Sequence, residues 1–472
     1  MSNVLLIMVD QQRYDCLGYS GARPVHTPNI DRLAGEGAWF DNAYTPIPLC
    51  CPARQAFLNG RRPEAIGGLW NYGITLPVPA LEPTEYAWPR ELQARGYRMG
   101  YVGKWHVHPE HDPTRYGYDD YVSEQDYAAF RMRQYPDVRY ENGWLGEADP
   151  IPLEDARTHW LADRAIGLLD NYAGSSQPWH LRLDLSEPHL PCRPAGKFAD
   201  MYPAGKIPRW GSFDERFDHK PYIQKQQLYN WGIEQYRWED WAPIVARYYG
   251  AVSQTDDAIG KVLERLEQTG DAENTIVVYT TDHGDLCGGH RMMDKHYVMY
   301  EDVVKVPLII RWPGRIAQGL RVSEFVYNLL DVPPTILECL GAEAPPGSHG
   351  RSLLPLLSNG RASKTAGWRQ EIVSTYNGQQ FGLYSQRMIR DERWKYVWNP
   401  TDLDELYDLR EDPHELTNQI SNHELRPIVR HMRERMYAVL HQDGDGLVNS
   451  SWMRNQLLQE DRKIDGREGV IR

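Results

Sequence analysis

The apolar positions of the chain predict a sheet of buried strands with helices between them. Residues 4–9 (Val-Leu-Leu-Ile-Met-Val) form an unbroken apolar run that ends at Asp10. Residues 275–279 (Thr-Ile-Val-Val-Tyr) form a second run that ends just before Asp282-His283. Continuous runs of this kind are typical of central strands covered on both faces. We therefore expect two central strands that deliver polar residues at their carboxyl ends, where open α/β sheets build their sites.

Helical periodicity separates these strands. Apolar residues recur near a 3.6-residue period over residues 243–268, which predicts a long amphipathic helix. Shorter helices are expected over residues 30–34 and 88–94, and a further strand begins near Val306. Strands that alternate with helices predict an α/β fold.

The pattern changes beyond about residue 360. Short apolar segments at 387–390 and 394–398 are broken by charged turns, and a helix is expected over 426–441. We therefore predict a large catalytic domain of residues 1–360 and a smaller α+β domain of residues 361–472. The last thirty residues are mostly polar and predict an irregular tail. The alternative, an arm that packs on another subunit, would make the protein a homo-oligomer.

Composition narrows the classes of partner. The chain has 472 residues and a formal net charge of −13, which argues against nucleic acid because polyanion binding depends on clustered Lys and Arg. It has no apolar run of about 18 residues that could cross a bilayer, so no membrane association is expected. The first residues carry no basic segment or cleavage site, and the six cysteines are scattered rather than spaced as a disulfide framework. These features predict a cytoplasmic protein.

Two strand-end pairs predict a metal site. Asp10 and Asp282 each follow a predicted strand, with Gln11 and His283 beside them as neutral ligands. Hard divalent cations prefer oxygen donors of this kind, while a histidine donor leaves Mn²⁺ or another softer cation open. An isolated Asp after a strand is more often a helix or turn cap, so the pairing carries the argument.

The stretch Cys50-Cys51-Pro52-Ala53-Arg54 carries the most specific motif of the chain. Taken alone, such a stretch is more often a buried structural cysteine beside a turn proline. The Cys-x-Pro-x-Arg spacing, however, resembles the maturation signature of the type I sulfatases, with Ala53 in place of the usual serine. The resemblance implies that a formylglycine-generating maturation enzyme oxidises Cys50, and not Cys51, to formylglycine (3-oxoalanine).

Further motifs extend the resemblance from Val4 to about Asn418. Gly103-Lys104-Trp105-His106 is similar to a sulfatase motif in which the lysine bridges sulfate and aldehyde hydrate and the histidine assists the hydrate. Glu187-Pro188-His189 and the segment from Asp282 to Lys295 also have counterparts. Without the family motif, Lys104 and His106 would be more naturally surface residues of an extended segment.

The resemblance implies a fold, a metal and a set of site residues. The fold is an alkaline-phosphatase-like domain with a central, mostly parallel sheet flanked by helices, plus a smaller domain with an antiparallel sheet. The metal is Ca²⁺, bound by Asp10, Gln11, the modified Cys50, Asp282 and His283. Catalytic roles are implied for Cys50, Arg54, Lys104, His106, His189 and Lys295, and substrate contacts for Asn71, Lys104, His189 and Lys295. Asn71 is equally readable as a turn residue.

These residues together predict sulfate ester hydrolysis. The hydrated aldehyde attacks sulfur, a covalent sulfo-enzyme forms, and either His189 or Lys295 protonates the leaving alcohol; the sequence does not choose between them. A small anionic sulfate ester is the expected substrate, first a sulfated carbohydrate because Trp and Tyr gather between residues 195 and 242, with aryl or choline sulfate as alternatives. A phosphonate monoester or phosphodiester hydrolase of the same superfamily is the nearest rival, and Lys104 and His106 favour sulfate over it.

Overall fold

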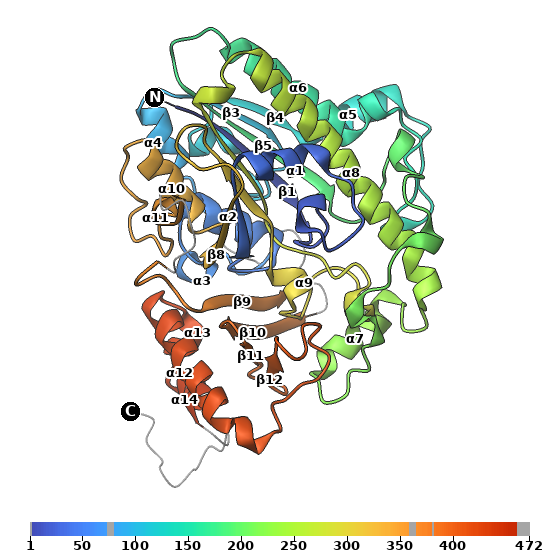
Figure 1. The fold of residues 1–472 in the computed structure, drawn as a ribbon, viewed down its shortest axis with the longest axis vertical. Coiled ribbons are helices and arrows are strands. Elements are labelled where there is room, and N and C mark those ends of the chain that lie inside the picture. The colour runs from blue at the N-terminus through green and yellow to red at the C-terminus, as the bar shows by residue number, and fades with distance from the viewer. Residues whose placement is uncertain (1, 73–79, 358–364, 380–381, 460–472) are drawn as a thin grey trace.

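A computed structural model describes residues 2–72, 80–357, 365–379 and 382–459 of the chain (Figure 1). Within these residues the chain forms an eight-stranded sheet and a four-stranded sheet. The first sheet has the strand order β4-β3-β5-β1-β6-β7-β2-β8 and the second has the order β12-β11-β10-β9. The predicted α/β fold with an additional antiparallel sheet is confirmed. The predicted boundary at residues 360–361 lies outside the described residues.

The strands of the large sheet are β1 (Asn3–Asp10), β2 (Ala38–Tyr44), β3 (Arg98–Gly103), β4 (Asp120–Ser123), β5 (Trp179–Pro188), β6 (Thr275–Thr281), β7 (Leu308–Arg311) and β8 (Leu320–Tyr327). Those of the small sheet are β9 (Ile372–Gln379), β10 (Gly382–Arg390), β11 (Trp394–Trp398) and β12 (Glu405–Asp408). The described helices are α1 (Pro28–Glu36), α2 (Cys50–Asn59), α3 (Pro63–Ile66), α4 (Pro89–Ala94), α5 (Glu124–Gln134), α6 (Arg157–Tyr172), α7 (Tyr222–Trp231), α8 (Trp238–Gln268), α9 (Glu301–Val304), α10 (Val332–Cys339), α11 (Leu354–Leu357), α12 (Arg426–Gln442), α13 (Gly446–Asn449) and α14 (Ser451–Leu458).

Both faces of the large sheet are covered by helices. Alternate residues of β1 from Leu5 to Val9 pack into a core shared with α1, α6 and α8. The intervening residues from Val4 to Met8 pack into a second core shared with α2, α4 and α10. Because successive side chains of a strand point to opposite faces, the unbroken apolar run of β1 supplies both cores. Figure 1 shows α6 and α8 crossing the sheet on one side.

Five neighbouring strands of the large sheet point the same way. β3 pairs in parallel with β4 and β5, and β1 pairs in parallel with β5 and β6. β7 runs antiparallel to both β6 and β2. The carboxyl ends of β3, β5, β1 and β6 therefore meet at one edge of the sheet, which is the usual location of a site in this architecture.

The small antiparallel sheet packs against α12 and against the large sheet. Its own core includes Ile389, Trp398, Met432 and Leu457. The hydroxyl of Ser374 in β9 donates to the carbonyl oxygen of Thr45, 2.6 Å away, at the end of β2. In Figure 1 the small sheet lies below the large one, with α12, α13 and α14 beside it.

The expectation of an irregular tail is wrong for residues 446–458, which form α13 and α14. Leu457 is fully buried in the small core, so a few apolar residues suffice to dock an otherwise polar helix. The remainder of the predicted tail, residues 460–472, lies outside the described residues.

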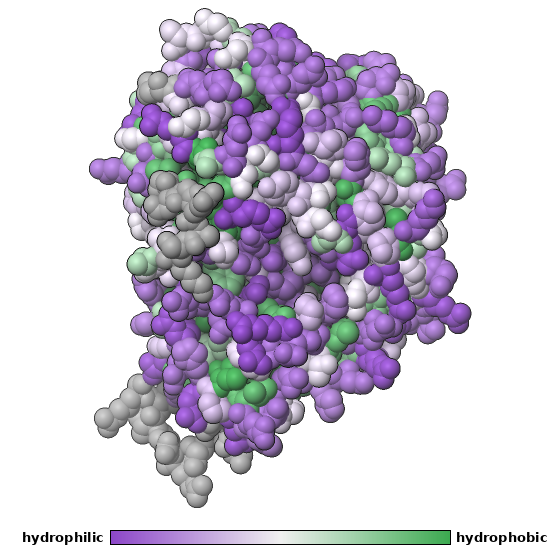
Figure 2. Space-filling view, in the orientation of Figure 1, coloured by the Kyte–Doolittle hydropathy of each residue, from purple (hydrophilic) through white to green (hydrophobic). Residues whose placement is uncertain are grey.

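The surface of the protein is mainly polar on the face shown in Figure 2. Figure 2 shows a mainly hydrophilic face on which hydrophobic residues form small separate patches. Across the described part of the chain, no helix combines the length and the apolar character that a membrane span requires.

Candidate active site

Strand ends bring the predicted polar residues to one edge of the large sheet. Asp10 ends β1, Asp282 follows β6, Lys104 follows β3 and His189 follows β5. Gln11 adopts a left-handed backbone with φ 64°, as does His106 with φ 48°. Non-glycine residues take this conformation rarely, and here both lie in the loops directly after the strands that lead to the site.

Cys50 occupies the first position of α2, a helix in which every residue is buried. Pro52 is compatible with the first turn because a proline there removes an N–H that has no partner within the helix. Arg54 is four residues further on and lies on the same face as Cys50. The helix N-terminus carries a partial positive charge, which favours an anionic nucleophile at Cys50. The Cys-x-Pro-x-Arg spacing therefore fits the first turns of a helix.

Four potential metal ligands converge at Cys50. The ligand atoms of Asp10, Cys50, Asp282 and His283 all lie within 4.8 Å of one another. The Cys50 sulfur lies 3.1 Å from His283 Nε2 and 3.8 Å from Asp10 Oδ1. His283 Nδ1 donates to the carbonyl oxygen of Gly284, 2.9 Å away, so its Nε2 lone pair faces the carboxylates.

This donor set fits a divalent cation. Two carboxylates and one imidazole nitrogen with a free lone pair supply hard and borderline donors at one point. Burial is the largest cause that lowers the pKa of His283, and a neutral ring is the form that binds a metal. Gln11 adjoins the set, and its backbone N–H donates to Asp282 Oδ1 at 3.2 Å.

Arg54 holds the carboxylates of this cluster in place. Its guanidinium donates to Asp282 Oδ2 at 3.0 Å, to Asp184 Oδ2 at 2.6 Å and to Asp10 Oδ2 at 3.2 Å. A fourth bond reaches the carbonyl oxygen of Lys104 at 3.2 Å. With so many of its donors engaged, Arg54 acts on the site mainly by orienting the acidic groups around Cys50.

Lys104 is a second cation at the same carboxylate oxygen of Asp10 that Arg54 contacts. Its Nζ lies 2.5 Å from Asp10 Oδ2, and its side chain is 15% exposed whereas that of Asp10 is fully buried. Burial opposes ionisation of Asp10, but Lys104 and neighbouring cations outweigh it and hold the pKa of this carboxyl well below its ordinary value. Asp10 therefore stays an anionic ligand, and Lys104 stays charged beside it.

Lys295 and His189 form a directly hydrogen-bonded pair. Lys295 Nζ donates to His189 Nε2 at 3.0 Å and to Gln11 Oε1 at 2.8 Å. His189 Nδ1 donates to the carbonyl oxygen of Leu190, 2.6 Å away, so the neutral ring accepts at Nε2. Burial opposes the charge of Lys295, but Asp294 outweighs it and raises the pKa of the ammonium. The two candidate proton donors thus share one position in the site.

His106 is half-buried beside the same cations. Burial and then Lys104 and Arg54 lower the pKa of His106 well below its ordinary value. Within the described residues its Nδ1 has no hydrogen-bond partner, and its ring packs edge-on against Tyr72 at 5.1 Å between centroids. A neutral imidazole with a free nitrogen is suited to accept a proton.

Asn71 contacts the nucleophile's helix. Its Oδ1 accepts from the backbone N–H of Cys51 at 2.8 Å, and its own N–H donates to Gln379 Oε1 at 3.1 Å. The side chain therefore caps the first turn of α2, a role that helix starts require because their N–H groups lack partners. The predicted substrate contact of Asn71 stays a prediction.

Asp184 is a site residue that sequence reasoning missed. It is fully buried in β5 and accepts hydrogen bonds from Arg54, from Tyr101 Oη at 2.8 Å, and from Arg182 Nε at 2.8 Å. Its place in the alternating sequence Leu181-Arg182-Leu183-Asp184-Leu185 offered a hint, since a charged pair within a strand needs partners on the same face.

Two cavities flank Lys104. One, of about 570 Å³, is lined by Lys104 and His106 together with Tyr72 and Tyr121. The other, of about 360 Å³, is lined by Lys104 and His189 and by residues of α5 and the loop after β5. Lys104, whose ammonium contacts Asp10 of the cluster around Cys50, borders both cavities.

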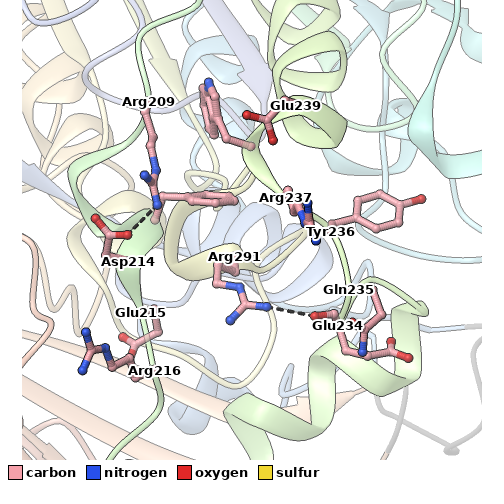
Figure 3. A pocket seen from close by; sticks show the side chains of 12 residues that line it. Arg209, Asp214, Glu215, Arg216, Glu234, Gln235, Tyr236, Arg237, Glu239 and Arg291 are labelled. Carbon is pink, nitrogen blue, oxygen red and sulfur yellow. Dashed lines mark hydrogen bonds and ion pairs between the residues drawn. The ribbon is translucent and has the colours of Figure 1, made fainter.

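Two of the tryptophans between residues 195 and 242 are buried and offer no face to a sugar. Trp210 and Trp241 are 2% and 0% exposed and pack in the core, where Trp210 lies under Arg13 at 4.1 Å. Trp238 does line a cavity of about 500 Å³ (Figure 3), but none of the predicted site residues borders it. Figure 3 shows the Arg209 side chain directed at Asp214 and that of Arg291 at Glu234, so two of the arginines there are already engaged.

Comparison with known proteins gives consistent matches over most of the chain. A family model described as sulfatase matches residues 2–342, and one described as N-sulphoglucosamine sulphohydrolase, C-terminal, matches residues 288–442. The arylsulfatase of Clostridium perfringens is 27% identical over 95% of this chain and 96% of its own length. The N-acetylglucosamine-6-O-sulfatase of Bacteroides thetaiotaomicron is 26% identical over 88% of this chain and 82% of its own length.

The fold also matches solved structures. The phosphonate monoester hydrolase of Agrobacterium radiobacter superposes with a TM-score of 0.79 at 25% identity, covering 94% of this chain and 96% of that chain. The architecture is therefore shared between enzymes named for two kinds of ester.

Proposed function

The chain belongs to the sulfatase family, whose members are sulfuric ester hydrolases, and we propose that it cleaves a sulfated carbohydrate to an alcohol and inorganic sulfate. The observation that carries this proposal is the position of Cys50. It starts a buried helix, faces two carboxylates and one imidazole, and has Lys104 beside the same cluster.

Cys50 is proposed as the precursor of the nucleophile. A formylglycine-generating maturation enzyme converts its side chain to an aldehyde, whose hydrate supplies an oxygen for attack on sulfur. The second hydroxyl of the hydrate then gives the covalent sulfo-enzyme an internal exit that an ordinary serine or cysteine ester lacks. Arg54 lies on the same face of α2 as Cys50, and it supports this role by holding the carboxylates of Asp282 and Asp10 in place.

A divalent cation, Ca²⁺ with Mn²⁺ as the alternative, is proposed to bind Asp10, Gln11, Asp282, His283 and the modified side chain of Cys50. When bound it supplies positive charge next to the sulfate oxygens. The amide oxygen of Gln11 accepts from Lys295 and keeps a second lone pair for this role.

Lys104 and Lys295 are proposed to hold the sulfate group. Both ammonium groups stand next to buried carboxylates that keep them charged, Lys104 beside Asp10 and Lys295 beside Asp294. Preorganised positive charge has its largest effect where negative charge develops in the transition state. The side chains are held in advance, so little reorganisation accompanies the reaction.

The proton transfers are assigned to two histidine-containing groups. The Lys295–His189 pair protonates the departing alcohol, because His189 borders the 360 Å³ cavity and Lys295 Nζ is hydrogen-bonded to its ring. His106 accepts the proton of the remaining hydroxyl as sulfate is expelled, since burial keeps its ring neutral.

A carbohydrate is the favoured substrate for two reasons. A relative is named as an N-acetylglucosamine-6-O-sulfatase. Tyr72 and Tyr121 also line the 570 Å³ cavity beside Lys104 and His106, where aromatic side chains can pack on a sugar face. Aryl sulfates are the next candidates, supported by the similarity to an arylsulfatase, and choline sulfate follows.

A phosphonate monoesterase is the second candidate function, supported by the superposition on a phosphonate monoester hydrolase. Lys104 and His106 favour a sulfate ester over a phosphonate ester as the substrate, because they match a sulfatase motif. Side-by-side assays of matured protein on sulfated sugars, nitrophenyl sulfate and a phenyl phosphonate ester test the choice. We expect the largest kcat/KM on a sulfated sugar. Turnover of the phosphonate with no sulfatase activity would refute the proposal.

The nucleophile is tested with the two adjacent cysteines. After coexpression with a maturation enzyme, peptide mass analysis should find Cys50 as the aldehyde or its hydrate and Cys51 as a thiol. Cys50→Ala should lower kcat at least about 10³-fold because the covalent route is lost. Cys51→Ala, the matched control, should keep activity within a few-fold. An unmodified Cys50 in fully active protein would contradict the assignment.

A further inference from the structure

The smaller cavity beside Lys104 contains two arginines without an ion-pair partner. Lys104 and His189 line this cavity, and its other charged lining residues are three arginines and three carboxylates: Arg131, Arg157, Arg193, Glu124, Asp149 and Glu187. Arg157 is balanced, because Glu187 lies 2.8 Å and Glu124 3.6 Å from its guanidinium. Among the residues that the structure describes, no carboxylate lies within ion-pair distance of Arg131 or Arg193.

Both guanidiniums lie against the ring of Tyr140, and Asp149 is the carboxylate whose charge acts on both of them. Their central carbons are 5.1 Å (Arg131) and 3.8 Å (Arg193) from its centroid. The two cations are therefore at most about 9 Å apart, the sum of those distances. Tyr140 is itself fixed, since its hydroxyl donates to Asp149 Oδ1 at 2.9 Å. Like charges held this close repel each other unless an anion lies between or beside them.

The donors of this pair are incompletely satisfied. The Nε atoms of Arg131 and Arg193 are both buried and have no acceptor among the described residues. The nearest anion, Asp149, already accepts from Tyr140 and from the backbone N–H of Ile151 at 3.0 Å. A buried N–H without an acceptor is unfavourable, so a ligand with anionic oxygens would gain both charge and hydrogen bonds here.

We propose that Arg131 and Arg193 form an anion subsite for a second acidic group of the substrate. This inference rests on the proposed function: one sulfate ester is held at Lys104, and a further sulfate or carboxylate on the same saccharide reaches the arginine pair. The planar fork of arginine suits both anions. The substrate class is thereby narrowed to a saccharide with at least two acidic groups.

Binding to the inactive Cys50→Ala protein tests the subsite without turnover. The calorimetric probes are glucosamine 6-sulfate, glucosamine 2-N,6-O-disulfate and a 6-sulfated glucosamine joined to a hexuronate. We expect at least one doubly acidic probe to bind about tenfold more tightly than the singly acidic one. The probe that gains identifies the second group as sulfate or carboxylate.

Variants of the arginines decide whether this pair is responsible. In the background of Cys50→Ala, the double change Arg131→Gln and Arg193→Gln should reduce the tenfold preference to less than about twofold and leave binding of glucosamine 6-sulfate unchanged. Arg193→Lys should retain part of the preference. Arg133→Gln is the matched control, because Arg133 is an exposed arginine in the last turn of the same helix.

The outcomes separate this inference from the proposed function. Equal binding of all probes by the protein with both arginines, or an unchanged preference after the double substitution, overturns the subsite. Loss of all binding together with a lowered unfolding midpoint in Arg193→Lys assigns the pair a structural role around Tyr140 and also overturns it. Absence of sulfate ester hydrolysis by matured wild-type protein refutes the proposed function itself.

Discussion

At the scale of single residues, the cluster around Cys50 is a balance of buried charge. Asp10, Asp184 and Asp282 contribute three carboxylates, and Arg54, Lys104 and Arg182 contribute three cations in contact with them. The cluster is therefore formally neutral before a cation or a substrate binds. A divalent cation would make it positive, which is the charge that a sulfate ester requires.

Asp184 is predicted to position Arg54 for this balance. Asp184→Asn keeps the size of the side chain but removes its negative charge. Arg54 and Arg182, which are both 0% exposed, then lose the carboxylate that they share. Removing one partner of a buried ion pair costs about 3–5 kcal/mol, so unfolding in urea should begin at lower concentration. A shift of Arg54 should also lower kcat about 10²-fold.

The control for this variant is Asp214→Asn. Asp214 pairs with Arg209 at the surface, where the two side chains are 73% and 48% exposed. Such pairs contribute about 0–1 kcal/mol, so stability and kcat should remain close to wild type. A stability loss in Asp184→Asn no larger than in the control would contradict the assigned role.

The Lys295–His189 pair gives a second residue-scale prediction. Because His189 donates through Nδ1 to Leu190, its Nε2 accepts a hydrogen bond from Lys295 in the resting site, and the proton stays on the lysine. We therefore expect Lys295 to be the proton donor. Lys295→Ala should lower kcat on a sugar sulfate by about 10²–10⁴-fold and on nitrophenyl sulfate much less, because nitrophenolate leaves without protonation.

His189→Ala is the comparison for this experiment. If His189 mainly orients Lys295, the loss of kcat in this variant should differ less between the sugar sulfate and nitrophenyl sulfate than it does in Lys295→Ala. Losses of equal size on both esters in Lys295→Ala would mean that this lysine only binds the sulfate group, and a selective loss in His189→Ala would assign the proton transfer to the histidine.

At the scale of elements, the sequence predicts strands well where both faces are apolar. β1 and β6 were identified from unbroken apolar runs, and the helix ending at Gln268 from its period. β5 was missed because His180, Arg182 and Asp184 interrupt its apolar residues. Their burial depends on partners such as Tyr118, Arg54 and Tyr101 that come from distant segments, which local pattern does not contain.

The candidate site divides in the same way. Asp10, Asp282 and Lys104 lie at or just after the ends of recognisable strands, and Cys50 is the first residue of a family motif. The sequence therefore predicts which residues gather at the site. The capping contact of Asn71 on α2 and the engagement of Arg54 with Asp184 were not predictable, because both are contacts between separate elements. Whether these residues act as proposed stays a prediction.

Gly103 shows how closely two strands must approach to deliver Lys104. It ends β3 with φ 105°, and an added Cβ would lie 1.9 Å from the carbonyl oxygen of Asp184 in β5. Gly103→Ala therefore combines a left-handed backbone with a clash and should destabilise the fold by about 3 kcal/mol. Displacement of Lys104 should also lower kcat/KM, measured beside the urea unfolding curve.

Gly167→Ala is the matched control for Gly103→Ala. Gly167 lies inside α6, and an added Cβ there meets no atom within 4 Å. Because alanine is the better helix former, this variant should be more stable than wild type by about 0.5–1 kcal/mol with unchanged activity. Effects of the same sign in both variants would contradict the argument.

At the scale of the whole molecule, the two sheets are joined by a buried ionic network. Lys395 of β11 lies 2.8 Å from Glu301 of α9 and 2.7 Å from Glu415. Arg390 of β10 contacts Glu301 at 2.7 Å, and Tyr44 at the end of β2 donates to the same carboxylate at 2.6 Å. The position of the small sheet beside the large one thus depends on charge at one buried point.

The network predicts a pH dependence of stability. Burial is the largest cause that raises the pKa of Glu415, with Glu301 adding to the effect and Lys395 opposing it, from 4.5 to about 7. Between these values the folded protein binds more protons than the unfolded chain, so stability falls as pH rises. Glu415 accounts for at most about 3 kcal/mol of that loss, which is absent below pH 4.5 and complete above about pH 7.

Glu415→Gln isolates this contribution because the amide keeps the shape of the side chain and does not titrate. Urea unfolding at pH 5 and at pH 8 should find a smaller difference between the two conditions in the variant than in wild type, by up to about 3 kcal/mol. Glu273→Gln, at a site 82% exposed, should leave the wild-type difference unchanged. An identical pH difference in wild type and Glu415→Gln would mean that the Lys395 ammonium fully offsets the burial of Glu415, and the junction between the sheets would then be insensitive to pH in this range.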